Sequence, residues 1–213
     1  DVWLIKTDSN GNEEWNRTFN GNNNTEDDGL CVKITTDNGY IITGTTNTGG
    51  TNEGDLWLIK TNSDGEEEWN RTFNGTDDYV DGGTSVVQTI DGGYVITGYT
   101  VSYGNGSSDS DVWLIKTDTN GNEEWNQTFG ASSSSEEGHS IGQTIDGGYI
   151  IVGHTYYFEN GNQDVYLIRL EGDGEPPSGI TVNYQSDWNL VGLPVEVENP
   201  YYLTLFPDAI ENT

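Results

Sequence analysis

The chain has few of the residues that form disulfides, insert into membranes or bind nucleic acids. Cys31 is the single cysteine among 213 residues, so no intrachain disulfide can form. No apolar run approaches the roughly 20 residues of a membrane-spanning helix, and we expect no membrane insertion. Only 7 Lys and Arg stand against 36 Asp and Glu, and a net charge of −29 repels nucleic-acid phosphates. We therefore expect no nucleic-acid partner, and an acidic surface that attracts Ca²⁺ or cationic partners.

The apolar residues are also few, but they are concentrated. They make up 31% of the chain, and Trp, Tyr, Val and Ile gather in short runs. The 29 glycines lie between these runs, where turns need them. Such a composition is typical of an all-β protein rather than of a disordered chain.

A heptapeptide repeat organises the sequence. Asp-Val-Trp-Leu-Ile-Lys-Thr stands at residues 1–7 and 111–117, a near copy stands at 55–61, and a clipped copy begins at Asp164. The step between copies is 54, 56 and 53 residues. Repeats of about 40–50 residues or slightly more, with four short strands each, are typical of β-propeller blades.

One repeat unit shows the expected strands. Apolar runs predict strands over 84–90, 94–100, 111–117 and 123–129. Asp-Gly and Asn-Gly between such runs indicate hairpin turns, because those turns need residues with positive φ. The two middle runs are apolar on both faces, which is expected for a sheet that lies between two other sheets.

The sequence therefore predicts an all-β chain of β-propeller blades, each of four antiparallel strands. We expect a half blade over 1–20, whole blades over 27–73 and 81–129, and an incomplete blade over 136–170. Because a closed ring normally has at least four blades, the blades form a partial ring or arc, or further blades lie upstream. By composition, residues 171–178 are a linker and 179–213 begin a small C-terminal β module.

Two family resemblances support this interpretation. The hairpin from Asp8 through Gly11 to Trp15, repeated from Asp118 to Trp125, is similar to the tryptophan-docking motif of quinoprotein propellers. It has one residue fewer between Asp and Gly, and the second copy carries Asn62 in place of the Asp. The resemblance implies that three indoles are wedges between blades, namely those of Trp15, Trp69 and Trp125.

The second resemblance covers residues 1–170. Asp-Gly-Gly-Tyr followed by an apolar strand and then by the heptapeptide resembles the tandem β-propeller repeats (SBBP-like) of secreted and surface proteins of bacteria and archaea. The segment around Trp188 resembles a module that follows such repeats near the C-termini of secreted proteins. The resemblance implies a secreted or cell-surface location and an architecture, but no reaction.

Loop lengths indicate where a ligand would bind. The first-to-second and third-to-fourth turns of each blade are minimal, whereas the other loops are long and leave the blades on one face. Loops on a rigid scaffold often carry binding residues. Exposed aromatic residues can stack on sugars or anchor proteins, or can pack locally within a loop. The aromatic candidates are Tyr79, Tyr103, Tyr156, Tyr157 and Phe158.

Acidic residues gather in the same long loops. Carboxylates and loop carbonyls are the ligands that Ca²⁺ needs, and Ca²⁺ is the one cofactor that the sequence suggests. The alternative is that these acids cap their own loop backbone. The candidate metal ligands are Asp27, Asp28, Asp77, Asp78, Asp81, Glu136 and Glu137. By contrast, the Asp that begins every heptapeptide recurs in each blade, which favours a structural hydrogen bond.

Two further residue types bear on function. His139 and His154 are the only histidines, and each lies at a strand end near an acidic loop, where it could bind a metal or transfer a proton. No nucleophile stands at a recognisable spacing from them, so we expect no enzyme. In an exported glycoprotein, the loop sequons at Asn23, Asn74 and Asn105 would be the most open to glycosylation.

These features favour an extracellular, non-catalytic binding or adhesion module that contacts a glycan or a surface protein. The alternative is a structural repeat of a cell-surface layer or filament, in which copies pair through open strand edges. A third hypothesis is a quinoprotein-like or glycan-cleaving enzyme whose active residues lie upstream.

Overall fold

The computed structural model describes residues 1–21, 26–47, 54–75, 79–103, 109–131, 134–157, 161 and 163–171. Across these ranges the chain is all β and contains no helix, which confirms the predicted fold class. None of the described segments is therefore a helix long and apolar enough to cross a membrane. The predicted linker, apart from Glu171, and the predicted module over 179–213 lie outside the described residues.

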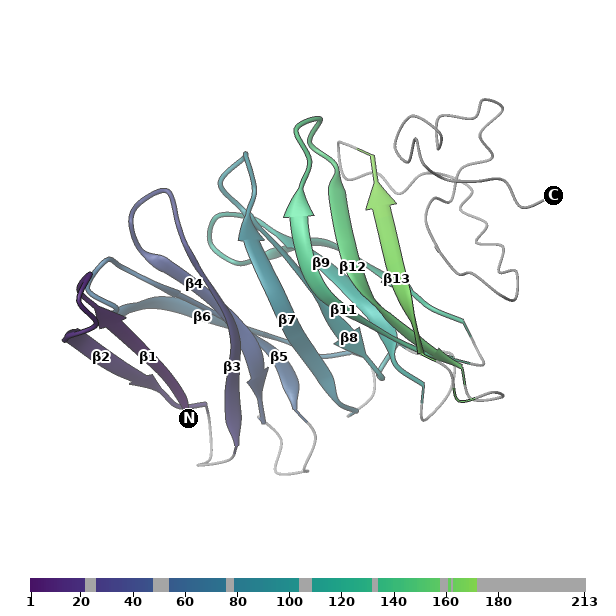
Figure 1. Ribbon diagram of the computed structural model, residues 1–213, viewed down its shortest axis with the longest axis horizontal. Coiled ribbons are helices and arrows are strands. Elements are labelled where there is room, and N and C mark those ends of the chain that lie inside the picture. The colour runs from purple at the N-terminus through teal and green to yellow at the C-terminus, as the bar shows by residue number, and fades with distance from the viewer. Residues whose placement is uncertain are drawn as a thin grey trace.

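The described strands form four antiparallel sheets in series (Figure 1). Sheet 1 pairs β1 (Val2–Thr7) with β2 (Glu13–Phe19). Sheet 2 contains β3 (Asp27–Ile34), β4 (Tyr40–Thr46), β5 (Asp55–Thr61) and β6 (Glu67–Phe73). Sheet 3 contains β7 (Asp81–Gln88), β8 (Tyr94–Thr100), β9 (Asp111–Thr117) and β10 (Glu123–Phe129). Sheet 4 contains β11 (Ser134–Gln143), β12 (Tyr149–Tyr157) and β13 (Gln163–Leu170).

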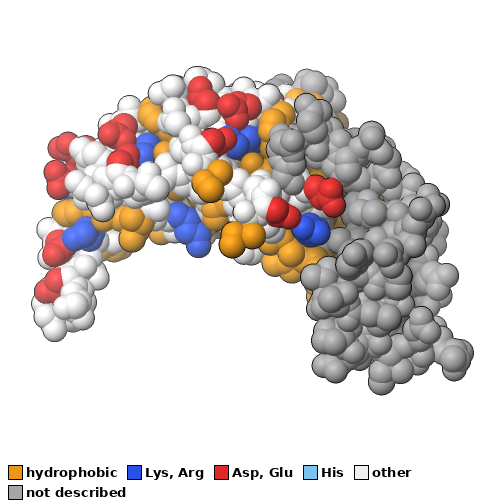
Figure 2. Space-filling view, turned by 90° about the horizontal axis from the view of Figure 1, so that it is seen from above, with side chains coloured by type: hydrophobic (Ala, Val, Ile, Leu, Met, Phe, Trp, Pro, Cys, Tyr) orange, Lys and Arg blue, Asp and Glu red, His pale blue; other side chains and the backbone are white. Residues whose placement is uncertain are grey.

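Each sheet is a meander, because every strand pairs with its neighbours in sequence. Sheets 2 and 3 are thus propeller-like blades of four antiparallel strands, and the described residues do not close a ring. The sheets stack face to face along a curved path (Figures 1 and 2). The first strands of neighbouring sheets, β3, β7 and β11, contact one another.

The hairpin turns have the backbone that their glycines allow. Gly65 and Gly121 in the third-to-fourth turns have φ of 76°, and Gly92 in a first-to-second turn has φ of 87°. Asn38 takes the place of Gly92 in sheet 2, with φ of 67°, because Asn tolerates the left-handed region better than most residues.

Apolar side chains fill each junction between sheets. Val2 and Phe19 of sheet 1 pack with Trp57 of sheet 2, and the same arrangement recurs between sheets 2 and 3 around Trp113. Between sheets 3 and 4, Tyr166 takes the place of these indoles. The middle strands β8 and β9 are therefore buried on both faces along almost their whole length.

The second tryptophan series also lies at the junctions. Trp15 meets Tyr40 of the following sheet edge-on, with ring centroids 5.7 Å apart. The same contact joins Trp69 to Tyr94 at 5.7 Å, and Trp125 meets Tyr149 at a tilt, at 5.9 Å. Each indole therefore contacts an aromatic ring of the next sheet.

The predicted bounds of the first strand of sheet 3 were wrong. β7 runs over Asp81–Gln88, three residues earlier at its start than the predicted strand over 84–90. Asp81 pairs with Thr100, and the ladder continues through a β-bulge between Gly83 and Ser85, which the apolar pattern does not reveal. As a consequence, acids expected in loops lie in first strands, namely Asp27 and Asp28 in β3, Asp81 in β7, and Glu136 and Glu137 in β11.

Candidate functional site

One end of the sheets carries all the long loops. In an antiparallel meander, the second-to-third and fourth-to-first connections leave from the same end, which we call the loop edge. The opposite end, the turn edge, carries the short hairpin turns, such as the one closed by the hydrogen bond from Gly92 N to Thr89 O. Substitutions and insertions at the loop edge therefore disturb the sheets least.

Three of the predicted tyrosines lie at the loop edge. Tyr79, Tyr103 and Tyr156 are 38%, 38% and 39% exposed. The ring of Tyr103 packs against the buried indole of Trp113, with centroids 5.6 Å apart, so it belongs partly to the core. The side chain of Tyr157 and all of Phe158 lie outside the described residues.

The acids at the start of the first strands hold the loops that precede them. The buried carboxylates of Asp27 and Asp81 accept hydrogen bonds from the backbone N–H of Gly21 and Gly75, at 2.9 and 2.8 Å. Glu136 does the same for Ala131 at 3.3 Å.

A hydroxyl group of the neighbouring strand or loop also donates to each acid. The donors are Thr46 to Asp27 at 2.7 Å, Ser102 to Asp81 at 2.9 Å, and Thr155 to Glu136 at 2.6 Å. These three acids lie one in each of sheets 2, 3 and 4, and several of their oxygens already accept hydrogen bonds from the loops or neighbouring hydroxyls. A Ca²⁺ site built from them stays a prediction, and Asp77 and Asp78 lie outside the described residues. Asp28 is exposed on β3 and pairs with Thr45.

One buried carboxylate has no such partner. Asp111 begins β9 and is 2% exposed, and its buried Oδ1 has no hydrogen-bond partner among the described residues. Asp111 and Glu136 both face Gly130, where any side chain would collide with their oxygens. Burial, together with the charges of Glu136 and Asp109, raises the pKa of Asp111 to about 6. This junction of sheets 3 and 4 can therefore take up a proton or attract a cation.

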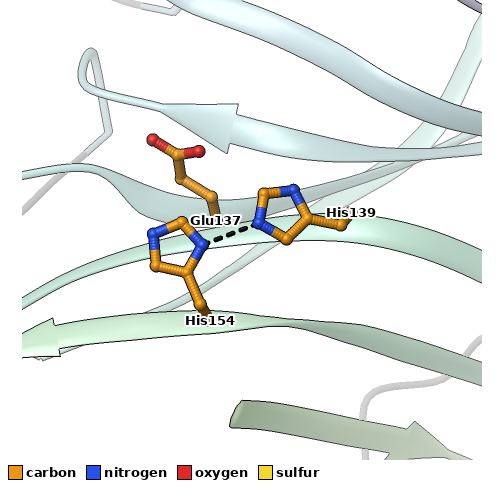
Figure 3. A group of neighbouring side chains, drawn as sticks. All are labelled: Glu137, His139 and His154. Carbon is orange, nitrogen blue, oxygen red and sulfur yellow. Dashed lines mark hydrogen bonds between the residues drawn. The ribbon is translucent and has the colours of Figure 1, made fainter. Parts of the chain in front are cut away.

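The two histidines, which were predicted at strand ends near acidic loops, lie instead within β11 and β12, where they meet. His139 Nε2 lies 2.6 Å from His154 Nδ1, and the carboxylate of Glu137 lies beside them (Figure 3). Their meeting follows from the pairing of β11 with β12, which the sequence predicted, and from a bulge in β11, which it did not.

Sequence reasoning missed two buried lysines. Lys116 contacts Asp91 and Glu124 at 2.9 and 2.8 Å, and Lys60 makes the equivalent pairs with Asp37 and Glu68. Although burial acts in the opposite direction, hydrogen bonds from Thr89, Lys116 and the Gly93 N–H lower the pKa of Asp91 to about 2. The signal was a lysine directly after four apolar residues in a strand that is apolar on both faces.

Of the predicted glycosylation sites, Asn74 is exposed at the loop edge directly after β6. Asn23 and Asn105 lie outside the described residues.

Together these features define the chain as a repeat β protein of propeller-like sheets in series. No protein-family model matches the chain, and no curated protein matches it. Among solved structures, it is similar to a protein of unknown function from Bacteroides caccae, with a TM-score of 0.45 and 12% identity over 75% of this chain. The chain spans about half of that protein, 51% of its length, and this likeness carries no argument about function.

Proposed function

We propose that the chain is an extracellular, non-catalytic binding or adhesion module that contacts a glycan or a surface protein through its loop edge. The observation that carries this proposal is the presence there of three partly exposed tyrosines, Tyr79, Tyr103 and Tyr156, on a stacked-sheet scaffold. Tyrosine offers a large ring and a hydroxyl group, which suits both sugar faces and protein surfaces.

The scaffold supports the ring of Tyr103 and contacts the backbone of Tyr79. Tyr103 rests on Trp113, and its backbone N–H donates to Thr100 Oγ1 at 3.2 Å. Asp81 accepts the hydroxyl proton of Ser102, the residue before Tyr103, and Ser102 Oγ lies 3.4 Å from the carbonyl oxygen of Tyr79. The ring of Tyr103, fixed in this way, loses little conformational freedom on binding, which favours affinity.

The family and location belong to the same proposal. Blades of this kind resemble SBBP-like repeats of secreted and surface proteins, and the acidic surface and the exposed sequon at Asn74 are compatible with that location. On this view the chain is one segment of a β-propeller-type repeat that displays its loop edge to the surroundings.

A glycan array and a capture assay against surface proteins test the loop edge. We expect binding by the wild type and a loss of roughly tenfold or more for each of Tyr79→Ala and Tyr156→Ala, since aromatic anchors commonly contribute more than 1 kcal/mol. The matched controls are Ile90→Ala and Ile145→Ala, which remove exposed side chains at the turn edge. Equal losses in the controls, or no binding by the wild type, would contradict the proposal.

A second candidate, self-assembly, is favoured by the end sheets. Trp3 and Ile5 of sheet 1 are exposed, whereas their counterparts Trp57 and Ile59 are buried against the preceding sheet. At the other end, Ile150 and Val152 of sheet 4 are exposed, although Val95 and Thr97 at the same register are covered by the next sheet. Because both faces derive from one repeat, copies could stack head to tail.

Sedimentation over a range of concentrations separates the two candidates. Self-assembly predicts concentration-dependent oligomers that Trp3→Glu reduces to monomers. A wild type that stays monomeric throughout would remove the second candidate and leave the first intact. The earlier hypothesis of pairing through strand edges predicts oligomers that Trp3→Glu does not disrupt.

A further inference from the structure

Glu137, His139 and His154 converge on one face of sheet 4. Glu137 pairs directly with His154 across β11 and β12, so both side chains lie on the same face. A β-bulge between Gly138 and Ser140 leaves His139 outside the paired register, and bulges re-aim side chains in this way. The planes of the two imidazoles are nearly parallel, 22° apart, and the rings lie edge to edge with centroids 4.9 Å apart. One ligand atom from each of the three residues lies within 4.8 Å of the others (Figure 3).

We propose that these three side chains form a binding site for a divalent transition-metal ion of the Zn²⁺ class. The site is separate from the loop-edge binding proposed above and does not depend on it.

The repeat itself shows that the three residues are not needed for the fold. The same bulge recurs between Gly29 and Cys31 and between Gly83 and Ser85. The residues that correspond to Glu137, His139 and His154 are Asp28, Leu30 and Thr45 in sheet 2, and Gly82, Thr84 and Tyr99 in sheet 3. Three metal-ligand types therefore coincide in sheet 4 alone among these sheets.

The position of His139 in sheet 4 also has different surroundings from the equivalent position of Thr84 in sheet 3. In sheet 3, the hydroxyl of Thr84 donates a hydrogen bond to the carbonyl of Gly138 in sheet 4, so this register helps to join neighbouring sheets. In sheet 4, His139 is exposed and no further described sheet lies against it. The three side chains are thus free to bind an ion from solvent.

The donor set favours Zn²⁺ over Ca²⁺. Imidazole nitrogens bind Zn²⁺, Cu²⁺ and Ni²⁺, whereas Ca²⁺ takes six to eight oxygens. Two histidines and a glutamate form a known zinc ligand set that leaves a fourth position for water or for a group of a bound partner.

The two ring nitrogens need only a small adjustment, and the ligand atom of Glu137 lies within 4.8 Å of both. Ligands of a tetrahedral zinc ion lie about 3.3 Å apart, given metal–ligand distances of about 2.0–2.1 Å. The two ring nitrogens are somewhat closer, at 2.6 Å, which requires one to carry a proton and the other a lone pair. A metal ion would replace this shared proton as the exposed rings turn slightly apart. The net charge of −29 raises the local concentration of cations.

Calorimetry with Zn²⁺ on the full chain tests the site, in an excess of Ca²⁺ that occupies scattered carboxylates. We expect one Zn²⁺ per chain. Because the chain has only two histidines, NMR of the imidazole nitrogens reports on this site alone, and both rings should shift together at one equivalent. Zn²⁺ should also raise the Tm, since a ligand that binds only the folded state stabilises it.

The substitutions can be taken from the repeat itself. His139→Thr and His154→Tyr introduce the residues that sheet 3 carries at the same register, so the fold should persist. Each should weaken Zn²⁺ binding by roughly 100-fold, because loss of even an outer partner costs about 10–100-fold. Glu137→Gln should also weaken it, whereas Asp28→Asn, the matched control in sheet 2, should not. Undiminished one-to-one binding by the double histidine variant, or imidazole signals that do not move, would overturn the proposal.

Discussion

The heptapeptides 1–7 and 111–117 are identical in sequence but lie in different surroundings. Trp3 in sheet 1 is 65% exposed, whereas Trp113 in sheet 3 is 1% exposed. β9 lies between β8 and β10 within its sheet and between sheets 2 and 4, while β1 pairs only with β2 in the described chain. The comparison teaches that neighbouring sheets, rather than the heptapeptide itself, determine burial.

The lysines of the two heptapeptides differ in the same way. Lys116 is buried and contacts both Asp91 and Glu124, and its ammonium also donates to the carbonyl of Thr117. Lys6 pairs only with Glu14 at the surface, because the described part of sheet 1 has no first strand and no acid from a first turn. One sequence therefore makes a buried ion cluster in one place and a surface ion pair in the other.

The largest expected effect is the difference in stability between substitutions of Trp113 and of Trp3. Trp113→Ala should destabilise the chain by about 3–5 kcal/mol, since it removes a large buried ring and leaves a cavity. Trp3→Ala should change the free energy of unfolding by less than about 0.5 kcal/mol, as is usual at exposed positions. Urea denaturation of both variants measures the difference. Similar losses in the two variants would mean that Trp3 is covered in solution.

The stability contributed by Asp111, which begins the buried heptapeptide, should depend on pH, whereas that of Asp1, which begins the exposed one, should not. In the folded state, burial together with the charges of Glu136 and Asp109 raises the pKa of Asp111 from 3.8 to about 6, so the folded chain binds its proton more tightly. Stability from this group is therefore present below about pH 4 and is lost as the pH rises through 6. Asp111→Asn should stabilise the chain at pH 7 by on the order of 2–3 kcal/mol, with no gain at pH 4.

The exposed Asp1 provides the control, because Asp1→Asn should have little effect at either pH. Thermal denaturation at both pH values measures the change. A destabilised Asp111→Asn variant at pH 7 would indicate that the ionised carboxylate has a partner, such as a bound cation.

Removal of the lysine charge should have the next largest effect. Lys116→Met leaves Asp91 and Glu124 near an apolar side chain and should cost about 2 kcal/mol, whereas Lys6→Met should cost less than about 1 kcal/mol. Because the pKa of Asp91 is lowered to about 2, its contribution is present above about pH 4 and is lost as the pH falls through 2. Urea denaturation at pH 7 and pH 2 should therefore show the cost of Lys116→Met shrinking at the lower pH.

The smallest expected effect is the difference between two glycine substitutions, of which only one disturbs an indole of the neighbouring sheet. Gly11 and Gly121 both have positive φ, so substitution by Ala strains both turns by about 1 kcal/mol. A Cβ at Gly121 would also lie 2.5 Å from the indole of Trp69, whereas a Cβ at Gly11 would meet nothing within 4 Å. Gly121→Ala should therefore cost about 1–2 kcal/mol more than Gly11→Ala, as measured by thermal denaturation. Equal costs would show that this indole does not contact the turn in solution.

Much of the fold could be predicted because its signals are local. The ranges 94–100, 111–117 and 123–129 coincide with β8, β9 and β10, since alternating apolar runs and glycine turns mark both ends. The start of β7 could not be found, because Asp81 and Gly82 have low strand propensity and enter the ladder only through pairing with β8.

The candidate sites were harder to predict. Asp81 and Glu136 could be named as candidate ligands, but their hydrogen bonds to the loops depend on where each first strand begins. The contact between His139 and His154 depends on a bulge that shifts one side chain, and no periodicity of apolar residues records such a shift. The loop-edge position of Tyr79, Tyr103 and Tyr156 could be predicted because long loops and their aromatic residues are visible in the sequence, whereas their role in binding stays a prediction.

Hydrogen exchange of the two identical heptapeptides tests most directly whether neighbouring sheets set stability. Their intrinsic exchange rates are nearly equal because the sequences are the same, so any difference reports on structure. We expect the amides of 112–116 to exchange only through global unfolding, and those of 2–6 to exchange much faster through local opening. Equal protection of the two segments in one sample would contradict this, and would place another surface against β1.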